Sequence, residues 1–196
     1  MQIEDKKYQI LQASLEVFGS YGYKKTSMQD IADTLGISRP ALYQYYKNKE
    51  AVFLALVEYT LKLGEQAAIK GFSRSTDNFE CLLHGVKDME QVLFGPIFLK
   101  PNGKELLTLS KKLAPELMQN FEVQLFDKVV CVLEKALIQQ EIDLTKLNIE
   151  VPNVARVILL GIDGIKNASN SLEELDQQLN LFLTVFWQGL MTNPRS

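Results

Sequence analysis

The side chains best suited to recognition chemistry lie between Ser38 and Gln44 of this 196-residue sequence. Arg39 can form two hydrogen bonds with the edge of a guanine, and Gln44 can form two with an adenine, because each side chain carries paired polar groups. Ala41 and the ring of Pro40 are small enough to contact the methyl group of a thymine. We therefore expect this stretch to read base edges in double-stranded DNA.

A second group of polar side chains surrounds this stretch and is suited to phosphate oxygens. Contacts of this kind position a protein on DNA without reading its sequence. The expected phosphate contacts are Thr26, Tyr43, Tyr45, Lys47 and Lys49, with Ser27 beside them. Asn48 can cap a further helix, whose amino terminus forms an anion site with Lys49 in its first turn.

Two short helices joined by a tight turn would carry these residues. Ser27 and Asp30 have the spacing of a capping box, which predicts the start of the first helix. Gly36 suits the left-handed conformation that ends it, and Ser38 is a good N-cap for the next helix. The inward-facing side chains would be Ile31, Ala32, Leu35, Leu42 and Tyr46. This spacing is typical of a helix-turn-helix, whose second helix enters the major groove.

The remaining sequence also has helical periodicity, so we predict an all-α fold. A first helix over residues 4–20 would complete a three-helix domain at residues 1–50. A larger helical domain would occupy residues 51–196, with helices near 51–70, 77–94, 104–113, 115–140, 151–168 and 172–191. Turn-rich segments at 71–78, 95–103 and 141–152 would connect them.

Composition narrows the function classes. Residues 1–50 contain 7 Lys or Arg against 6 Asp or Glu, while residues 51–196 contain 14 against 18, so a polyanion should prefer the first domain. The amino terminus lacks the basic and apolar regions of a secretory signal, and the most apolar stretches are about half the ~20 residues that cross a bilayer. We expect a cytoplasmic protein that does not enter a membrane.

Cysteine usage and catalytic motifs give further exclusions. Cys81 and Cys131 are far apart, form no CxxC, and are expected to be buried thiols without a disulfide, metal or zinc site. The sequence has no GxGxxG, P-loop, HExxH or nucleophile elbow, and its single histidine leaves few routes for proton transfer. We therefore expect neither an enzyme nor a bound cofactor.

The residues from 10 to 53 resemble the DNA-binding domain of TetR-family transcriptional regulators. The resemblance rests on an ordered set that spans about a quarter of the chain: Phe18, Gly22, Thr26, Ile31, Ala32, Gly36, Ser38, Leu42, Tyr43, Tyr46 and Lys49. Pro40 departs from the pattern, because the family commonly has glycine or another small residue there. This departure bears on how closely the second helix approaches the groove.

The resemblance implies a homodimer, a helical carboxy-terminal domain that binds a small molecule, and a repressor that leaves a palindromic operator when the ligand binds. It places the dimer interface at the last two helices, as a four-helix bundle with two helices from each subunit. Apolar positions on two faces of residues 172–191 agree with this, although a core within one chain would give the same pattern. Control by a protein partner, or activation of transcription, is the alternative function.

Ligand contacts are harder to assign than DNA contacts. The candidates are His84, Met118, Phe121 and Trp187. His84 could equally be a surface or internally bonded imidazole, and apolar residues at helical spacing are more often core. Asp163 could hold a cationic ligand, form a hydrogen bond between subunits, or be an exposed carboxylate.

Overall fold

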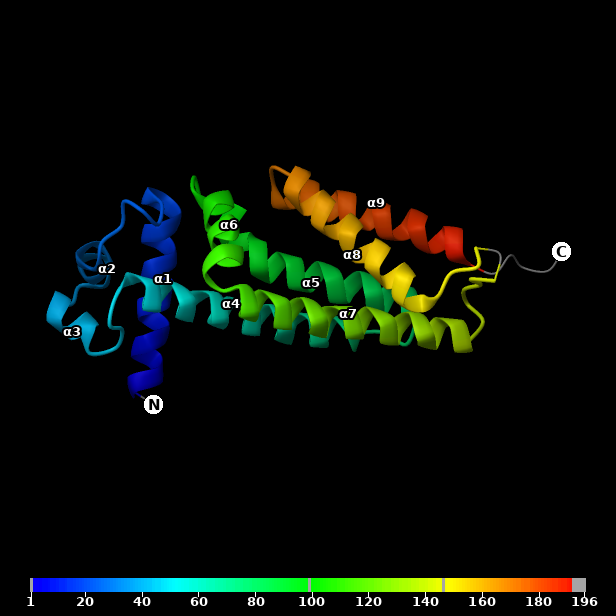
Figure 1. Ribbon diagram of the computed structural model, residues 1–196, viewed down its shortest axis with the longest axis horizontal. Coiled ribbons are helices and arrows are strands. Elements are labelled where there is room, and N and C mark those ends of the chain that lie inside the picture. Colours follow the sequence, from blue (N-terminus) through cyan, green and yellow to red (C-terminus); the bar gives the residue numbers. More distant parts are fainter. Residues whose placement is uncertain (1, 99, 146, 192–196) are drawn as a thin grey trace. The chain divides into compact units, whose positions relative to one another are not determined.

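The computed structural model describes residues 2–98, 100–145 and 147–191 (Figure 1). Parts of the predicted domain ends, at residues 1 and 192–196, and of two predicted connectors, at residues 99 and 146, lie outside this description. The helices are α1 (Gln2–Tyr21), α2 (Met28–Leu35), α3 (Arg39–Tyr43), α4 (Lys49–Phe72), α5 (Asn78–Phe98), α6 (Gly103–Leu113), α7 (Pro115–Ile138), α8 (Val151–Ala168) and α9 (Leu172–Leu190). The predicted all-α class is confirmed.

The chain forms two compact units. The first comprises Met1–Leu63 and Leu93–Gln119, and the second comprises Gly64–Val92 and Asn120–Ser196. Residues 51–63, and the described residues from 93 to 119, therefore belong to the same compact unit as the helix-turn-helix. The predicted domains, residues 1–50 for DNA binding and 51–196 for ligand binding and dimerisation, were defined by function, and this division stays a prediction.

Local signals place the helix ends of the first unit. The Ser27 hydroxyl accepts from Asp30 N while the Asp30 carboxylate accepts from Ser27 N at 2.7 Å, which completes the capping box. Gly36 has φ 68° and Gly22 has φ 81°, so both adopt the left-handed conformation that ends a helix most easily at glycine. Asn48 Oδ1 accepts from Ala51 N at 2.8 Å and caps α4 as predicted.

Aromatic and aliphatic side chains from α1, α2, α3 and α4 build the core of the first unit. Phe18 of α1, Ile31 of α2 and Leu42 of α3 are fully buried. The Phe18 ring lies 5.7 Å from the ring of Phe53, which begins the packing of α4 against α1. Leu106 of α6 joins the same cluster, so α6 also supports the helix-turn-helix.

The predicted end of the fifth helix, at Phe94, is wrong. Helix α5 continues through Pro96 to Phe98, where we predicted a loop. Pro96 lies in the last turn of the helix, so its missing N–H removes one hydrogen bond next to the helix end. Helix α3 ends at Tyr43, so Tyr46 lies beyond it, although Tyr46 still packs partly against the core.

The second unit has its own core between α5, α7, α8 and α9. Its fully buried side chains include Leu133, Ile158, Leu175 and Leu179, and the ring of Phe79 lies 5.7 Å from that of Trp187. The expectation for Cys81 is confirmed, since its thiol is buried, but Cys131 is exposed on α7 and the expectation for it is wrong. Helical spacing alone does not show which side of α7 faces solvent.

None of the helices in the described part of the chain is long and apolar enough to cross a membrane. Within the same residues, no cluster of three or more His, Cys, Asp or Glu side chains could hold a metal ion.

Candidate nucleic-acid interface and ligand pocket

Helix α3 is held by one apolar side chain and presents its polar side chains to solvent. Leu42 is fully buried, and the Ser38 hydroxyl accepts from Ala41 N at 3.3 Å, which positions the first turn. The exposed residues are Ser38, Arg39, Pro40, Tyr43 and Gln44, while Ala41 is half-buried. The structure therefore brings the predicted base-reading residues together on one short helix.

Arg39 and Tyr43 are neighbours on the exposed side of α3. Arg39 Nη2 donates to the Tyr43 hydroxyl at 3.2 Å, and its guanidinium carbon lies 5.5 Å from the centre of the tyrosine ring. One residue was predicted to read a base and the other to bind phosphate. Their contact means that Arg39 must leave Tyr43, or carry it along, when it approaches a base edge.

Lys49 is partly buried and is bonded to backbone carbonyl groups. Its Nζ donates to Tyr23 O at 2.6 Å and to Thr26 O at 2.7 Å, and it lies 4.4 Å from the centre of the Tyr23 ring. Partial burial lowers the pKa of the Lys49 ammonium group, while nearby Asp30 favours its charged form. The ammonium group ties the loop before α2 to the start of α4.

Thr26 is also part of this loop. Its side chain is buried, and its hydroxyl donates to Gly22 O at 2.9 Å. In the free chain Thr26 and Lys49 thus hold this loop, and their phosphate contacts stay predictions. No local pattern indicates this contact, because the two residues are 23 positions apart and meet only in the folded unit.

The other predicted phosphate contacts differ in exposure. Lys47 is exposed, and Ser27 is exposed while it caps α2. Tyr45 is only half-exposed, because it packs partly against the core of the first unit. Lys47, Ser27 and Tyr43 are thus the predicted positioning residues that the structure leaves available to solvent.

The four predicted ligand residues are divided between the two units. Met118 belongs to the first unit and packs partly against its core, whereas the other three belong to the second. Trp187 is buried against Phe79, which is the core alternative. His84 Nε2 lies 3.1 Å from Glu80 Oε2, so its imidazole is bonded within α5. Phe121 is half-buried.

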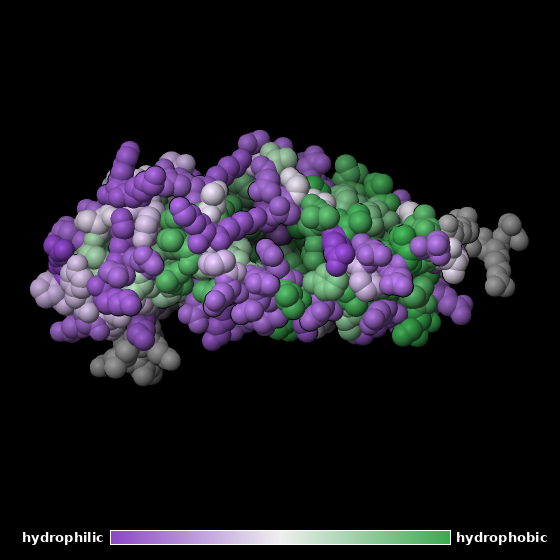
Figure 2. Space-filling view, viewed as in Figure 1, coloured by the Kyte–Doolittle hydropathy of each residue, from purple (hydrophilic) through white to green (hydrophobic). Residues whose placement is uncertain are grey.

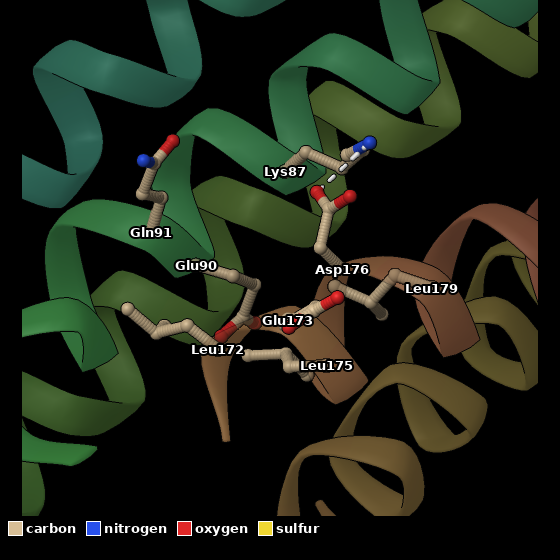
Figure 3. Close-up of a pocket in the computed structure, with 8 residues that line it drawn as sticks. All are labelled: Lys87, Glu90, Gln91, Leu172, Glu173, Leu175, Asp176 and Leu179. Carbon is tan, nitrogen blue, oxygen red and sulfur yellow. Dashed lines mark ion pairs between the residues drawn. The ribbon is translucent and has the colours of Figure 1, made fainter.

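A pocket of ≈ 280 Å³ lies elsewhere, between α5 and the beginning of α9 (Figure 3). Its lining residues are Lys87, Glu90, Gln91, Leu172, Glu173, Leu175, Asp176 and Leu179. Lys87 Nζ and Asp176 Oδ1 are 2.8 Å apart and form an ion pair at its edge. The sequence prediction named none of these as ligand residues.

Glu90 is the unusual group of this pocket. Its side chain is buried, and its Oε2 atom has no hydrogen-bond partner within the part of the chain that the structure describes. Burial raises the pKa of the Glu90 carboxyl to about 7; nearby Lys166 acts in the opposite direction and Asp163 adds to the rise. A signal was present, because Glu90 falls between Val86 and Leu93 at positions where the apolar stripe of α5 needs an inward residue.

Comparisons with known proteins agree with this architecture. The family model described as "Bacterial regulatory proteins, tetR family" matches residues 10–56. The uncharacterized HTH-type transcriptional regulator YezE of Bacillus subtilis is 45% identical over 60 residues, which is 31% of this chain and 30% of that protein. The HTH-type transcriptional activator FasR of Mycolicibacterium smegmatis is 31% identical over 84 residues, or 43% of this chain and 38% of its own length.

These matches span less than half of each relative. A solved TetR transcription regulator from Haloarcula marismortui extends the likeness of fold, with a TM-score of 0.78 over 97% of this chain and all of that chain, at 18% identity. The named relatives are regulators and not enzymes, as we expected of this chain. Residues 10–56 are therefore similar to the DNA-binding domain of the TetR family, and the chain as a whole shares its fold with a solved member of that family.

Proposed function

We propose that the chain is a cytoplasmic DNA-binding transcriptional regulator that acts as a homodimer on a palindromic operator. In this proposal it is a repressor, and a small molecule releases it from DNA. The observation that carries the proposal is the exposed polar surface of α3, where Arg39 and Gln44 stand free of the core beside a buried Leu42 anchor. A helix presented in this way fits the major groove.

Dimerisation is supported by an apolar surface that a single chain leaves uncovered. The α8–α9 apolar face consists of Val157 and Leu160 on α8 with Leu181 and Val185 on α9, each at least half exposed. Figure 2 shows apolar surface gathered over these two helices. Exposed patches of this kind mark interaction sites, and a second copy would bury the face as a four-helix bundle.

Response to a ligand is supported by the second unit. Its pocket of ≈ 280 Å³ is near the lower end of the about 300–1,000 Å³ range of ligand sites. Its lining combines three leucines with five polar or charged side chains, which can fix the orientation of a ligand. A second candidate function is activation of transcription, which the printed name of the relative FasR favours.

The proposal can be tested by selecting bound sequences from a random DNA library and footprinting the protein on the most enriched sequence. We expect two inverted half-sites about one helical turn apart, or a multiple of that, on one face of the duplex. A single asymmetric half-site would contradict the dimer. Transcription in vitro from a promoter that carries the site separates repression from activation, since the protein lowers transcript yield in one case and raises it in the other.

The role of α3 has its own test. Arg39→Ala should cost about 1–3 kcal/mol at one base pair and relax the preference there, because a bidentate contact to a base is lost. Binding to competitor DNA of unrelated sequence should change little. An equal loss of affinity for all sequences would remove Arg39 from base reading and assign it to phosphate.

A further inference from the structure

The α5–α9 pocket contains a buried acid whose charge the protein leaves poorly compensated. Glu90 is 4% exposed, and its Oε2 atom has no hydrogen-bond partner among the described residues. In Figure 3 its side chain points from α5 toward the first turn of α9, into the pocket. Such an atom carries a desolvation cost that a bound donor can remove.

The cation that acts on the Glu90 carboxyl is also engaged with another acid. Lys166 Nζ lies 2.6 Å from Asp163 Oδ1 on α8, so its charge is shared between that carboxylate and Glu90. At the pocket edge, Lys87 is likewise paired with Asp176. The lining therefore holds three acidic residues, Glu90, Glu173 and Asp176, against the single base Lys87. This balance favours a positively charged ligand and disfavours an anion.

The rest of the pocket suits the apolar body of such a ligand. Leu172, Leu175 and Leu179 follow one side of α9 at three- and four-residue spacing, beside the acid. An alkyl or aromatic group on these side chains would lose its contact with water, while a charged head reaches the carboxylate. A free inorganic cation would leave the leucine wall unused.

We propose that this pocket binds a small organic cation, with an amine or ammonium group on Glu90 Oε2 and an apolar body on Leu172, Leu175 and Leu179. The proposal that this ligand binds depends only on the geometry and charge of the pocket. Its role as the effector site rests on the proposed function, which it deepens by naming the ligand class.

The test uses three probes that share one alkyl chain: hexylamine, 1-hexanol and hexanoate. Calorimetric titration of the full chain should show hexylamine binding at least about tenfold more tightly than 1-hexanol, and no binding of hexanoate. In Glu90→Gln, hexylamine affinity should fall about ten- to a hundredfold, because a hydrogen bond to a charged group is lost. The affinity for 1-hexanol should stay unchanged.

A matched control is Glu134→Gln, which removes an exposed acid of α7 outside the pocket lining. It should bind hexylamine as the parent protein does. Binding of hexylamine and 1-hexanol with equal affinity, no binding of hexylamine, or undiminished binding by Glu90→Gln would each overturn the proposal. Because the probes are compared on the unmodified chain, misfolding of one variant cannot decide the result.

Dependence on pH gives a second readout. Hexylamine is protonated throughout, so its affinity should rise between pH 6 and pH 8 as Glu90 ionises. Other titratable groups line the site or act on Glu90, namely Lys87 on α5, Glu173 and Asp176 on α9, and Asp163 and Lys166 on α8. The rise must therefore vanish in Glu90→Gln; a rise that persists in this variant would contradict the assignment.

The two proposals fail separately. If hexylamine binds through Glu90 but leaves operator affinity unchanged, the binding site stands and its effector role fails. If hexylamine does not bind while another small molecule releases the protein from DNA, the cation site fails and the regulator proposal stands.

Discussion

At the scale of single residues, two neighbouring lysines show how burial separates structural from DNA-binding roles. Lys49 donates to two backbone carbonyls and covers the Tyr23 ring, whereas Lys47 is exposed. Both lie at the end of the helix-turn-helix and carry the same charge. Sequence alone gives them the same expected phosphate contact.

We expect Lys49→Ala to change stability and Lys47→Ala to change DNA binding. Lys49→Ala should lower the free energy of unfolding by about 1–2 kcal/mol, because Tyr23 O and Thr26 O lose a charged donor. Lys47→Ala should leave stability unchanged and reduce the slope of log affinity for DNA against log salt by about 1. Urea unfolding and salt titrations of DNA binding measure the two effects. A reduced slope in folded Lys49→Ala would show that Lys49 also contacts phosphate.

Glu90 makes stability depend on pH in a direction opposite to that of a paired carboxylate. Its pKa is about 7 in the folded chain against an ordinary 4.5, so the folded state binds more protons than the unfolded state between these values. The free energy of unfolding therefore falls as pH rises through this window. The shift corresponds to a contribution of up to about 3 kcal/mol, as an order of magnitude.

The prediction compares the stability of the parent chain with that of a variant that has a neutral side chain at position 90. Glu90→Gln should gain stability relative to the parent chain as pH rises from 4.5 to above 7, because it carries no carboxyl to ionise. Urea unfolding of both proteins across this range measures the difference, and Glu134→Gln supplies an exposed control that should follow the parent. A stability difference that is constant with pH would show that Glu90 titrates normally.

At the scale of elements, α4 and α5 pack closely within the second unit because glycine occurs on both sides of the contact. A Cβ atom at Gly71 would lie 2.4 Å from His84 O, and one at Gly85 would lie 2.6 Å from the Phe72 ring. The first clash is with backbone, which cannot rotate away. The end of α4 and the middle of α5 are therefore spaced by these two residues.

Gly71→Ala should lower the free energy of unfolding by about 1–3 kcal/mol, the usual cost of overpacking. Gly189→Ala is the matched control, since Gly189 also lies next to the end of its helix and has no neighbour within 4 Å of an added Cβ. It should be neutral or stabilising by up to about 1 kcal/mol. Thermal unfolding compares the two. Equal stability of both variants would contradict the close contact.

The helix-turn-helix was largely predictable because its signals are local. The capping box at Ser27, the left-handed Gly36 and the Ser38 cap each act within a few residues, so their geometry follows from the sequence. The end of α5 was missed where a proline was treated as a helix stop.

The candidate site was only half predictable for the same reason. Exposure of Arg39 and Gln44 follows from helical spacing, but the role of Lys49 depends on carbonyls 23 and 26 residues away. The pocket likewise needs α5 and α9 to meet, which no local pattern specifies. Glu90 was visible as an acid in an apolar stripe, but its missing partner was not.

At the scale of the whole molecule, function as proposed requires two copies of α3 on one DNA duplex. The α8–α9 apolar face is the surface available for pairing, with Leu160 67% exposed and Val185 60% exposed in the single chain. Two charges placed there would have to be buried unpaired against the second copy. An unpaired charge is costly when the dimer buries it, but the same charge has little cost in the monomer, where it stays exposed to water.

We therefore expect the double variant Leu160→Glu with Val185→Glu to remain folded but to sediment as a monomer at micromolar concentration. Ile138→Glu is the control, because Ile138 is 80% exposed on α7 and lies outside the face; it should remain dimeric. The monomer should lose about 10²–10⁴ in affinity for the full operator, since the second half-site no longer gains from a linked first contact. Its affinity for one isolated half-site should equal that of the parent. A double variant that stays dimeric would show that the interface lies elsewhere. A variant that is monomeric but binds the full operator with the parent's affinity would show that this affinity does not depend on dimerisation.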